Sequence, residues 1–182
     1  MNRKMKLLIN SLIIFCFFFG IYYTQGIYVS MKECVDDYLR TMYIEDNHII
    51  TSFECNNRVA VLCSDDENKY LRLVYLDCFT PFYKSNSIID ELIDPDKNAS
   101  LINDDNKDIG FISLVYRTNK DIAYVKYTFG GKDEFICEQW YGNYTYLNYP
   151  DFNYLKYAFY DKYPIFKCEA FDSNGNLIDV IH

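Results

Sequence analysis

Histidine is the side chain that most often serves as a general base near neutral pH, and this 182-residue chain has two, His48 and His182. Neither lies next to a nucleophile motif, and the sequence contains no G-x-S-x-G, no glycine-rich phosphate loop and no H-E-x-x-H. A Cys–His pair that uses His48 is an alternative, but a histidine on a strand surface is the favoured interpretation. Two histidines are too few for a histidine-based metal site. The sequence therefore predicts no catalytic residue, no metal and no cofactor.

Calcium needs only oxygen ligands, and one acidic segment follows the spacing of a calcium-binding loop. Positions one, three, five, seven and twelve of that spacing hold Asp94, Asp96, Asn98, Ser100 and Asp105. The segment departs from the pattern because Pro95 interrupts it, Ala99 replaces the glycine of the sharp turn, and Asp105 is shorter than the usual glutamate. The favoured interpretation is a solvated polar connection.

The most distinctive segment, residues 140–163, combines many aromatic residues with asparagine and aspartate. Its candidate ligand-binding residues are Trp140, Tyr141, Tyr144 and Tyr146. Aromatic rings flanked by amides and carboxylates can stack on sugars, and a glycosidase would add two carboxylates about 5–10 Å apart. The 26 Asp and Glu residues nominate no such pair. The favoured interpretation is structural, with alternating Tyr and Phe in cross-strand ladders whose phenols reach water.

Six of the seven cysteines follow the N-terminal apolar segment, without C-x-x-C or zinc spacing. They are Cys34, Cys55, Cys63, Cys78, Cys137 and Cys168. An even number outside the membrane permits disulfides, whereas free buried cysteines act as small apolar residues. Both interpretations remain open, and the bridge we predict, if one forms, joins Cys137 to Cys168 because both lie in late strands.

The N-terminal segment has the layout of an export signal. Arg3, Lys4 and Lys6 precede an apolar run over residues 7–23, which as a helix is about 25 Å long against a hydrocarbon core of about 30 Å. The positive-inside rule places the N-terminus in the cytoplasm and the rest outside. We expect a signal anchor, a single transmembrane helix over residues 1–26, that holds an extracytoplasmic domain over residues 27–182 at the cell membrane.

Two alternatives concern processing of this segment. Thr24 and Gly26 are small enough for a signal peptidase, so secretion after cleavage is the rival hypothesis, although the A-x-A pattern is missing. A lipoprotein modified at Cys16 is disfavoured because the preceding residue, Phe15, is large.

The exported part is strongly acidic. Without Arg3, Lys4 and Lys6, 15 of the 18 Lys and Arg residues remain against 26 Asp and Glu, a formal charge of −11. Such a domain is repelled by nucleic acid and by anionic lipid. The charge favours either plain solubility or a basic protein partner.

Residues 30–43 form the clearest predicted helix, because apolar residues recur at helical spacing and Ser30 with Glu33 forms a capping box. Period-two patterns then predict an antiparallel meander of strands over 48–55, 58–64 and 70–79. Residues 87–93 are predicted to form a short helical turn. Residues 98–108, the most polar segment of the chain, are predicted to be an exposed connection, and the best candidate for a subdomain seam lies near residues 94–108.

The second half repeats the strand pattern. The predicted strands cover residues 109–117, 122–129, 134–140, 155–160, 165–172 and 177–181, with turns at 119–120, 130–131 and 173–175. Gly175 gives the strongest turn signal, because glycine readily takes a positive φ. The predicted fold is mainly β, with an N-terminal amphipathic helix, a meander and a β-sandwich-like C-terminal half.

Three segments, residues 111–115, 119–126 and 169–178, carry a resemblance to a group of proteins. They resemble the second half of small membrane-anchored extracytoplasmic proteins of unknown function from low-GC Gram-positive bacteria. The resemblance covers about half of the chain and implies a membrane anchor, a meander and a sandwich-like end, but no activity.

These observations favour a non-enzymatic, membrane-anchored extracytoplasmic module that binds a protein or cell-wall component and no nucleic acid. The alternatives are a cell-envelope glycan-binding protein or glycosidase, and an immunity or inhibitor protein that binds a basic toxin or hydrolase.

Overall fold

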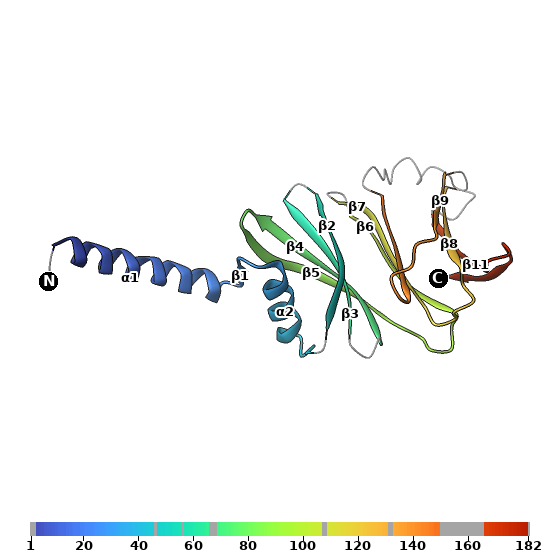
Figure 1. Ribbon diagram of the computed structural model, residues 1–182, viewed down its shortest axis with the longest axis horizontal. Coiled ribbons are helices and arrows are strands. Elements are labelled where there is room, and N and C mark those ends of the chain that lie inside the picture. Colours follow the sequence, from blue (N-terminus) through green and yellow to red (C-terminus); the bar gives the residue numbers. More distant parts are fainter. Residues whose placement is uncertain are drawn as a thin grey trace.

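The computed structural model describes residues 3–45, 47–55, 57–65, 69–106, 109–130, 133–149 and 166–181. Its first element, α1 (Arg3–Thr24), is a 22-residue helix that projects away from the rest of the molecule (Figure 1). At 1.5 Å per residue it is about 33 Å long. Its apolar side chains are exposed, and the helix is long and apolar enough to cross a membrane, a property that membrane anchors share with signal sequences.

A short junction joins α1 to the domain. After Gln25 and Gly26, the strand β1 (Ile27–Tyr28) pairs with a strand of the first sheet, and the helix α2 (Met31–Thr41) follows. Gly26 has a φ of +69°, a conformation that favours glycine. The Ser30 side chain accepts a hydrogen bond from the Glu33 backbone N–H at 3.4 Å, which confirms the predicted cap of this helix.

Sheet A is an antiparallel sheet in the order β1-β5-β4-β3-β2. Its longer strands are β2 (His48–Cys55), β3 (Arg58–Ser64), β4 (Tyr70–Phe79) and β5 (Phe82–Leu92). Strands β2, β3 and β4 form the predicted meander with the predicted bounds. β5 extends it by one further hairpin.

Two smaller antiparallel sheets follow among the described residues. Sheet B has the order β10-β7-β6 and consists of β6 (Ala99–Asn106), β7 (Gly110–Arg117) and β10 (Tyr144–Tyr149). Sheet C has the order β12-β11-β8-β9 and consists of β8 (Tyr124–Phe129), β9 (Asp133–Cys137), β11 (Phe166–Phe171) and β12 (Leu177–Ile181). The predicted strand over residues 155–160 lies outside the described residues.

The sheets form layers, with sheet B between sheet A and sheet C (Figure 1). In β7, the buried Leu114 packs with sheet A, whereas its neighbour Val115 packs with sheet C. The other face of sheet A is covered by α2, whose buried residues include Val35 and Leu39. The prediction of a mainly β fold with an N-terminal helix is confirmed.

The predicted helical turn over residues 87–93 is wrong, because these residues belong to β5 and the loop after it. Ile88 packs in the core between sheet A and α2, and Ile89 packs in the core between sheets A and B. Ile88 and Ile89 are partly buried on opposite faces of β5, so apolar residues are adjacent there, a pattern that periodicity alone does not distinguish from a helix.

The predicted exposed connection over residues 98–108 is wrong in part. β6 occupies most of it, and Leu101 and Ile102 are buried in two different cores. The segment is polar because β6 is an edge strand, so that residues such as Asn103 face solvent. Ser100 therefore lies in a strand, and its hydroxyl accepts a hydrogen bond from the Asp94 backbone N–H at 3.2 Å.

The predicted subdomain seam in the same segment is crossed by one continuous core. This core joins Leu62 and Leu73 of sheet A to Ile112 and Leu114 of sheet B, on the two sides of the segment in sequence.

The two-sided burial of β7 leads to a stability prediction. Leu114→Ala and Val115→Ala should each lower the free energy of unfolding by about 2–3 kcal/mol, because each leaves a cavity, one on either face of sheet B. Ile136→Ala, at a position that is 56% exposed on β9, is the control and should have little effect. Urea titration of the full chain in mild detergent measures all three. A near-neutral result at either β7 position contradicts the middle position of this sheet.

Candidate functional site

The four aromatic residues predicted to bind a ligand are close in sequence but differ in their surroundings. Tyr144 and Tyr146 belong to β10, Tyr141 forms an isolated bridge with Tyr144, and Trp140 lies between β9 and β10. The remaining aromatic residues of the predicted segment beyond Tyr149 lie outside the described residues.

Trp140 is held on two sides by the protein itself. Its indole N–H donates to the Ala123 carbonyl at 2.7 Å, and the Arg117 guanidinium lies 4.2 Å above its ring centre. The ring also packs against the core between sheets B and C. Cation–π contact and hydrogen bonding therefore give Trp140 a structural role.

The three tyrosines differ in exposure, from the core to the surface. Tyr144 is 8% exposed, its ring centre is 5.2 Å from that of Tyr116, and burial raises its pKa. The ring centre of Tyr146 is 5.4 Å from that of Phe53 and 5.3 Å from that of Tyr141, on which it stacks. Of this set only Tyr141, which is 46% exposed, presents a large part of its ring to solvent. A hydrogen bond with the Tyr146 phenol raises the pKa of Tyr141.

The predicted bridge between Cys137 and Cys168 does not form, because both are free cysteines. They lie on β9 and β11, the two strands that flank β8. Two strand spacings amount to about 9.5 Å, whereas the Cα atoms of a disulfide are less than about 7 Å apart. Burial raises the pKa of the Cys137 thiol to about 11 and that of Cys168 well above its usual value. Both behave as small apolar core residues.

A polar concavity of about 550 Å³ lies between the β7–β8 connection and the β11–β12 hairpin, and we call it the distal hollow. The hairpin, red in Figure 1, lies at the end of the molecule opposite α1. The polar lining includes Arg117, Asn119, Lys120, Asp121, Asp172 and Asn174. Ile122, Ala123 and Ile178 supply the apolar part. The hollow thus offers cations, carboxylates and amides over a small apolar floor.

The hairpin side of the hollow is ordered by one carboxylate. Asp172 accepts hydrogen bonds from the backbone N–H groups of Asn174 and Asn176, both at 2.8 Å. The Asn176 side chain donates a further bond to it at 2.9 Å. These bonds, above all that from the Asn176 side chain, lower the pKa of Asp172. Gly175, at a φ of +83°, completes the turn as predicted.

The opposite side is ordered by Asn119 and Arg117. The Asn119 side chain accepts from the Asp121 backbone N–H at 2.9 Å and donates to the Asn98 side chain at 3.1 Å. Arg117 donates to the Ile122 carbonyl at 2.6 Å and to the Gly142 carbonyl at 3.3 Å. Because these side chains are used to fix the backbone, the exposed Lys120 and Asp121 are positioned at the rim.

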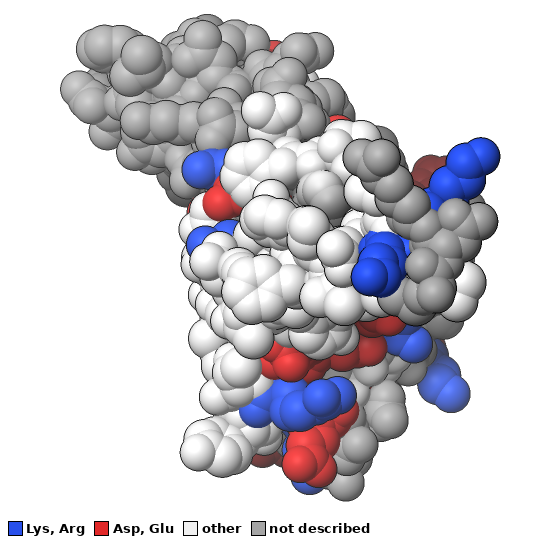
Figure 2. All heavy atoms as spheres, turned by 90° about the vertical axis from the view of Figure 1, so that its left-hand side faces the viewer, with Lys and Arg blue, Asp and Glu red and all other residues white. Residues whose placement is uncertain are grey.

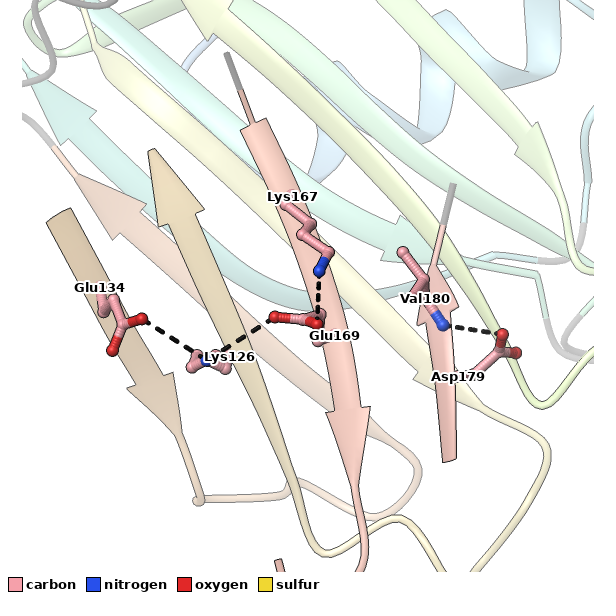
Figure 3. Close-up of polar contacts among 6 residues, drawn as sticks. All are labelled: Lys126, Glu134, Lys167, Glu169, Asp179 and Val180. Carbon is pink, nitrogen blue, oxygen red and sulfur yellow. Dashed lines mark hydrogen bonds and ion pairs between the residues drawn. The ribbon is translucent and has the colours of Figure 1, made fainter. Parts of the chain in front are cut away.

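Beside the hollow, the outer face of sheet C carries a network of compensating charges (Figure 3). Lys126 lies 3.5 Å from Glu134 and 3.6 Å from Glu169, and Lys167 lies 2.6 Å from Glu169. Asp179 on β12 accepts from the Val180 backbone N–H at 2.8 Å. Lys126 links β8 to its neighbours β9 and β11, whereas Lys167 and Glu169 both belong to β11. These charges are compensated within the sheet, so the hollow is the better candidate site.

Both turns that line the hollow were predicted from the sequence as turns, without a role in binding. The signal was present, because Asn-Lys-Asp and Asp-Ser-Asn-Gly are both sequences whose side chains bond the following backbone. What was missing was the pairing of β8 with β11, which brings the two turns together.

The chain matches no protein-family model, no curated protein and no solved structure. The resemblance to small membrane-anchored extracytoplasmic proteins therefore stays a prediction, and the candidate site depends on its geometry alone.

The surroundings of Trp140 predict graded effects on stability. Trp140→Phe keeps a ring below Arg117 but loses the bond to Ala123, which costs about 1 kcal/mol. Trp140→Ala also removes the packing and should cost about 3 kcal/mol. Tyr141→Ala is the exposed aromatic control and should change stability least. Thermal and urea unfolding rank the three variants, and a larger loss for Tyr141→Ala than for Trp140→Ala would contradict the structural role.

Proposed function

We propose that this chain is a membrane-tethered, extracytoplasmic binding module whose distal hollow binds a polar component of the cell envelope. α1 holds the domain at the membrane with its N-terminus in the cytoplasm, and the hollow faces away from the bilayer. The observation that carries the proposal is the position of a polar concavity, built by two ordered turns, at the end of the molecule opposite an exposed apolar helix.

The helix supports the tether because most of its apolar surface is not covered by the described part of the chain. Leu8, Leu12 and Phe17 are each more than half exposed, and none of the apolar window is buried. A helix that is apolar on every side is stable in lipid and costly in water. The three cations before it favour the orientation with the N-terminus inside.

The chemistry of the hollow favours a ligand that carries hydroxyl, amide and carboxylate groups. Lys120 and Arg117 lie opposite Asp172 and close to Asp121, so that the lining contains both signs of charge. A purely basic partner would be repelled by these cations, whereas a glycan with amide and acidic groups can bond to a lining residue through each of these groups. A fragment of wall glycan that carries a short peptide has this chemistry.

The tether is tested by protease treatment of intact cells that express the chain with a tag at each end. We expect loss of the C-terminal tag, protection of the N-terminal tag, and an N-terminal tag that stays in the membrane fraction. Leu12→Arg should weaken insertion, because an arginine at the helix centre costs about 3 kcal/mol. Release of a shortened chain into the medium supports signal cleavage instead, and a protected C-terminal tag refutes the extracytoplasmic location.

The hollow is tested by titration with soluble glycan–peptide fragments of the cell wall. Trp140 is the single tryptophan, and it contacts Arg117 in the lining, so ligand binding should change its fluorescence. Lys120→Ala should weaken binding roughly tenfold, the loss of about 1.4 kcal/mol expected for one charged contact. Lys32→Ala, an exposed change on α2, is the matched control. Unchanged fluorescence together with no heat of binding by calorimetry refutes this ligand class, and turnover of the fragments would show an enzyme instead.

A further inference from the structure

The junction between α1 and sheet A carries aromatic side chains that the distal hollow does not use. Tyr22, near the end of α1, stacks on Phe82 with ring centres 5.7 Å apart and planes 4° from parallel. Tyr23 meets Tyr28 edge to face at 4.9 Å. Phe79, which pairs with Phe82 across the hairpin between β4 and β5, is 58% exposed. Aromatic side chains thus gather where the apolar helix ends.

The position of α1 in the bilayer sets the depth of these aromatic side chains, so the inference rests on the proposed tether. When residues 7–23 lie in the bilayer, Tyr22 and Tyr23 are at its outer boundary, where tyrosine is enriched. Phe82 stacks on Tyr22 and is therefore at the same level. Phe79 is its direct partner across the hairpin and lies beside it.

The connection is too short for the hairpin to leave this level. Only Gln25 and Gly26 separate α1 from β1, so the Cα atoms of Thr24 and Ile27 are at most about 11 Å apart. β1 pairs with β5 immediately after Phe82, with Tyr28 opposite Tyr83 and Ile27 opposite Lys84. The Tyr28 phenol donates to Asp37 of α2, which ties the junction to the domain on its other side.

The charge of the face around α1 indicates what kind of contact the domain makes with the bilayer. Figure 2 views the molecule from the α1 side, with uncharged side chains across the middle and most of the acidic ones in the lower part. An acidic domain gains nothing from anionic headgroups. Contact with the bilayer therefore depends on aromatic burial rather than on charge attraction.

We propose that the tip of the β4–β5 hairpin, with Phe79 and Phe82, is inserted in the outer headgroup region of the bilayer as a second membrane contact beside α1. It fixes the orientation of sheet A relative to the membrane. The occupant of this exposed aromatic surface is lipid.

The experiment uses the full chain in vesicles of phosphatidylcholine and phosphatidylglycerol, with Trp140→Phe to remove the native fluorescence. Phe79→Trp then places one tryptophan at the hairpin tip. Leu92→Trp is the matched control, because Leu92 has the same 58% exposed fraction and lies at the far end of the same hairpin. We expect lipids brominated near the carbonyl groups to quench Phe79→Trp and not Leu92→Trp, and soluble acrylamide to quench them in the opposite order. Added salt should not change either result.

The outcomes separate this inference from the tether. If neither tryptophan is quenched by the brominated lipids while the chain resists alkaline extraction, the hairpin contact is refuted and the tether stands. If both are quenched equally, a specific contact at the tip is refuted. If alkaline extraction releases the chain, the tether fails and the hairpin contact with it. Near-ultraviolet circular dichroism of each variant confirms that the comparison is made between folded proteins.

Discussion

The burial of both faces of β7 is the constraint on which the arrangement of the domain depends. Leu114 belongs to the core shared with sheet A and Val115 to the core shared with sheet C, so both cores that join sheet B to its neighbours depend on this strand. Ser113, which precedes Leu114 in β7, is buried and faces sheet C. Its hydroxyl forms a hydrogen bond with the fully buried Tyr127 phenol at 3.1 Å. A buried phenol without a partner is costly, and this bond helps to fix how the two sheets meet.

The same strand connects the core to the distal hollow, because its last residue lines the hollow. Arg117 is the last residue of β7, and its guanidinium lies over Trp140 and bonds the carbonyl groups of Ile122 and Gly142. A shift of β7 would therefore move the wall of the hollow. The polar residues that could bind a ligand lie in connections, where side chains replace the hydrogen bonds that the sheets provide elsewhere.

The sequence was sufficient wherever one pattern had one interpretation. The capped helix and the strands β2, β3 and β4 were predicted with nearly the observed bounds, because their caps, turns and propensities agree. The failures at β5 and β6 have one cause, because layering places cores on both faces of these strands and removes simple alternation. Ile88 and Ile89 pack against two different cores, and Leu101 and Ile102 are buried in two different cores. The aromatic site was predicted by residue type, but exposure depends on tertiary packing, which assigned Tyr144 to the core and left Tyr141 at the surface. The hollow depends on strand pairing between segments about 45 residues apart, as at Val125 and Ala170, and no local pattern specifies that pairing.

The layers also relate the two ends of the molecule to each other. Stacked sheets lie about 10 Å apart, so sheet C is about 20 Å beyond sheet A. Under the proposed tether and hairpin contact, a two-residue connection and an aromatic contact hold sheet A at the bilayer, and the hollow stands at a set height above the headgroups. A rigid arrangement lowers the entropy lost on binding a ligand that is itself fixed in the envelope, because the module has fewer orientations to give up. Burial in the layers and the short connection thus both favour the proposed orientation, with the apolar end in lipid and the polar end toward the envelope.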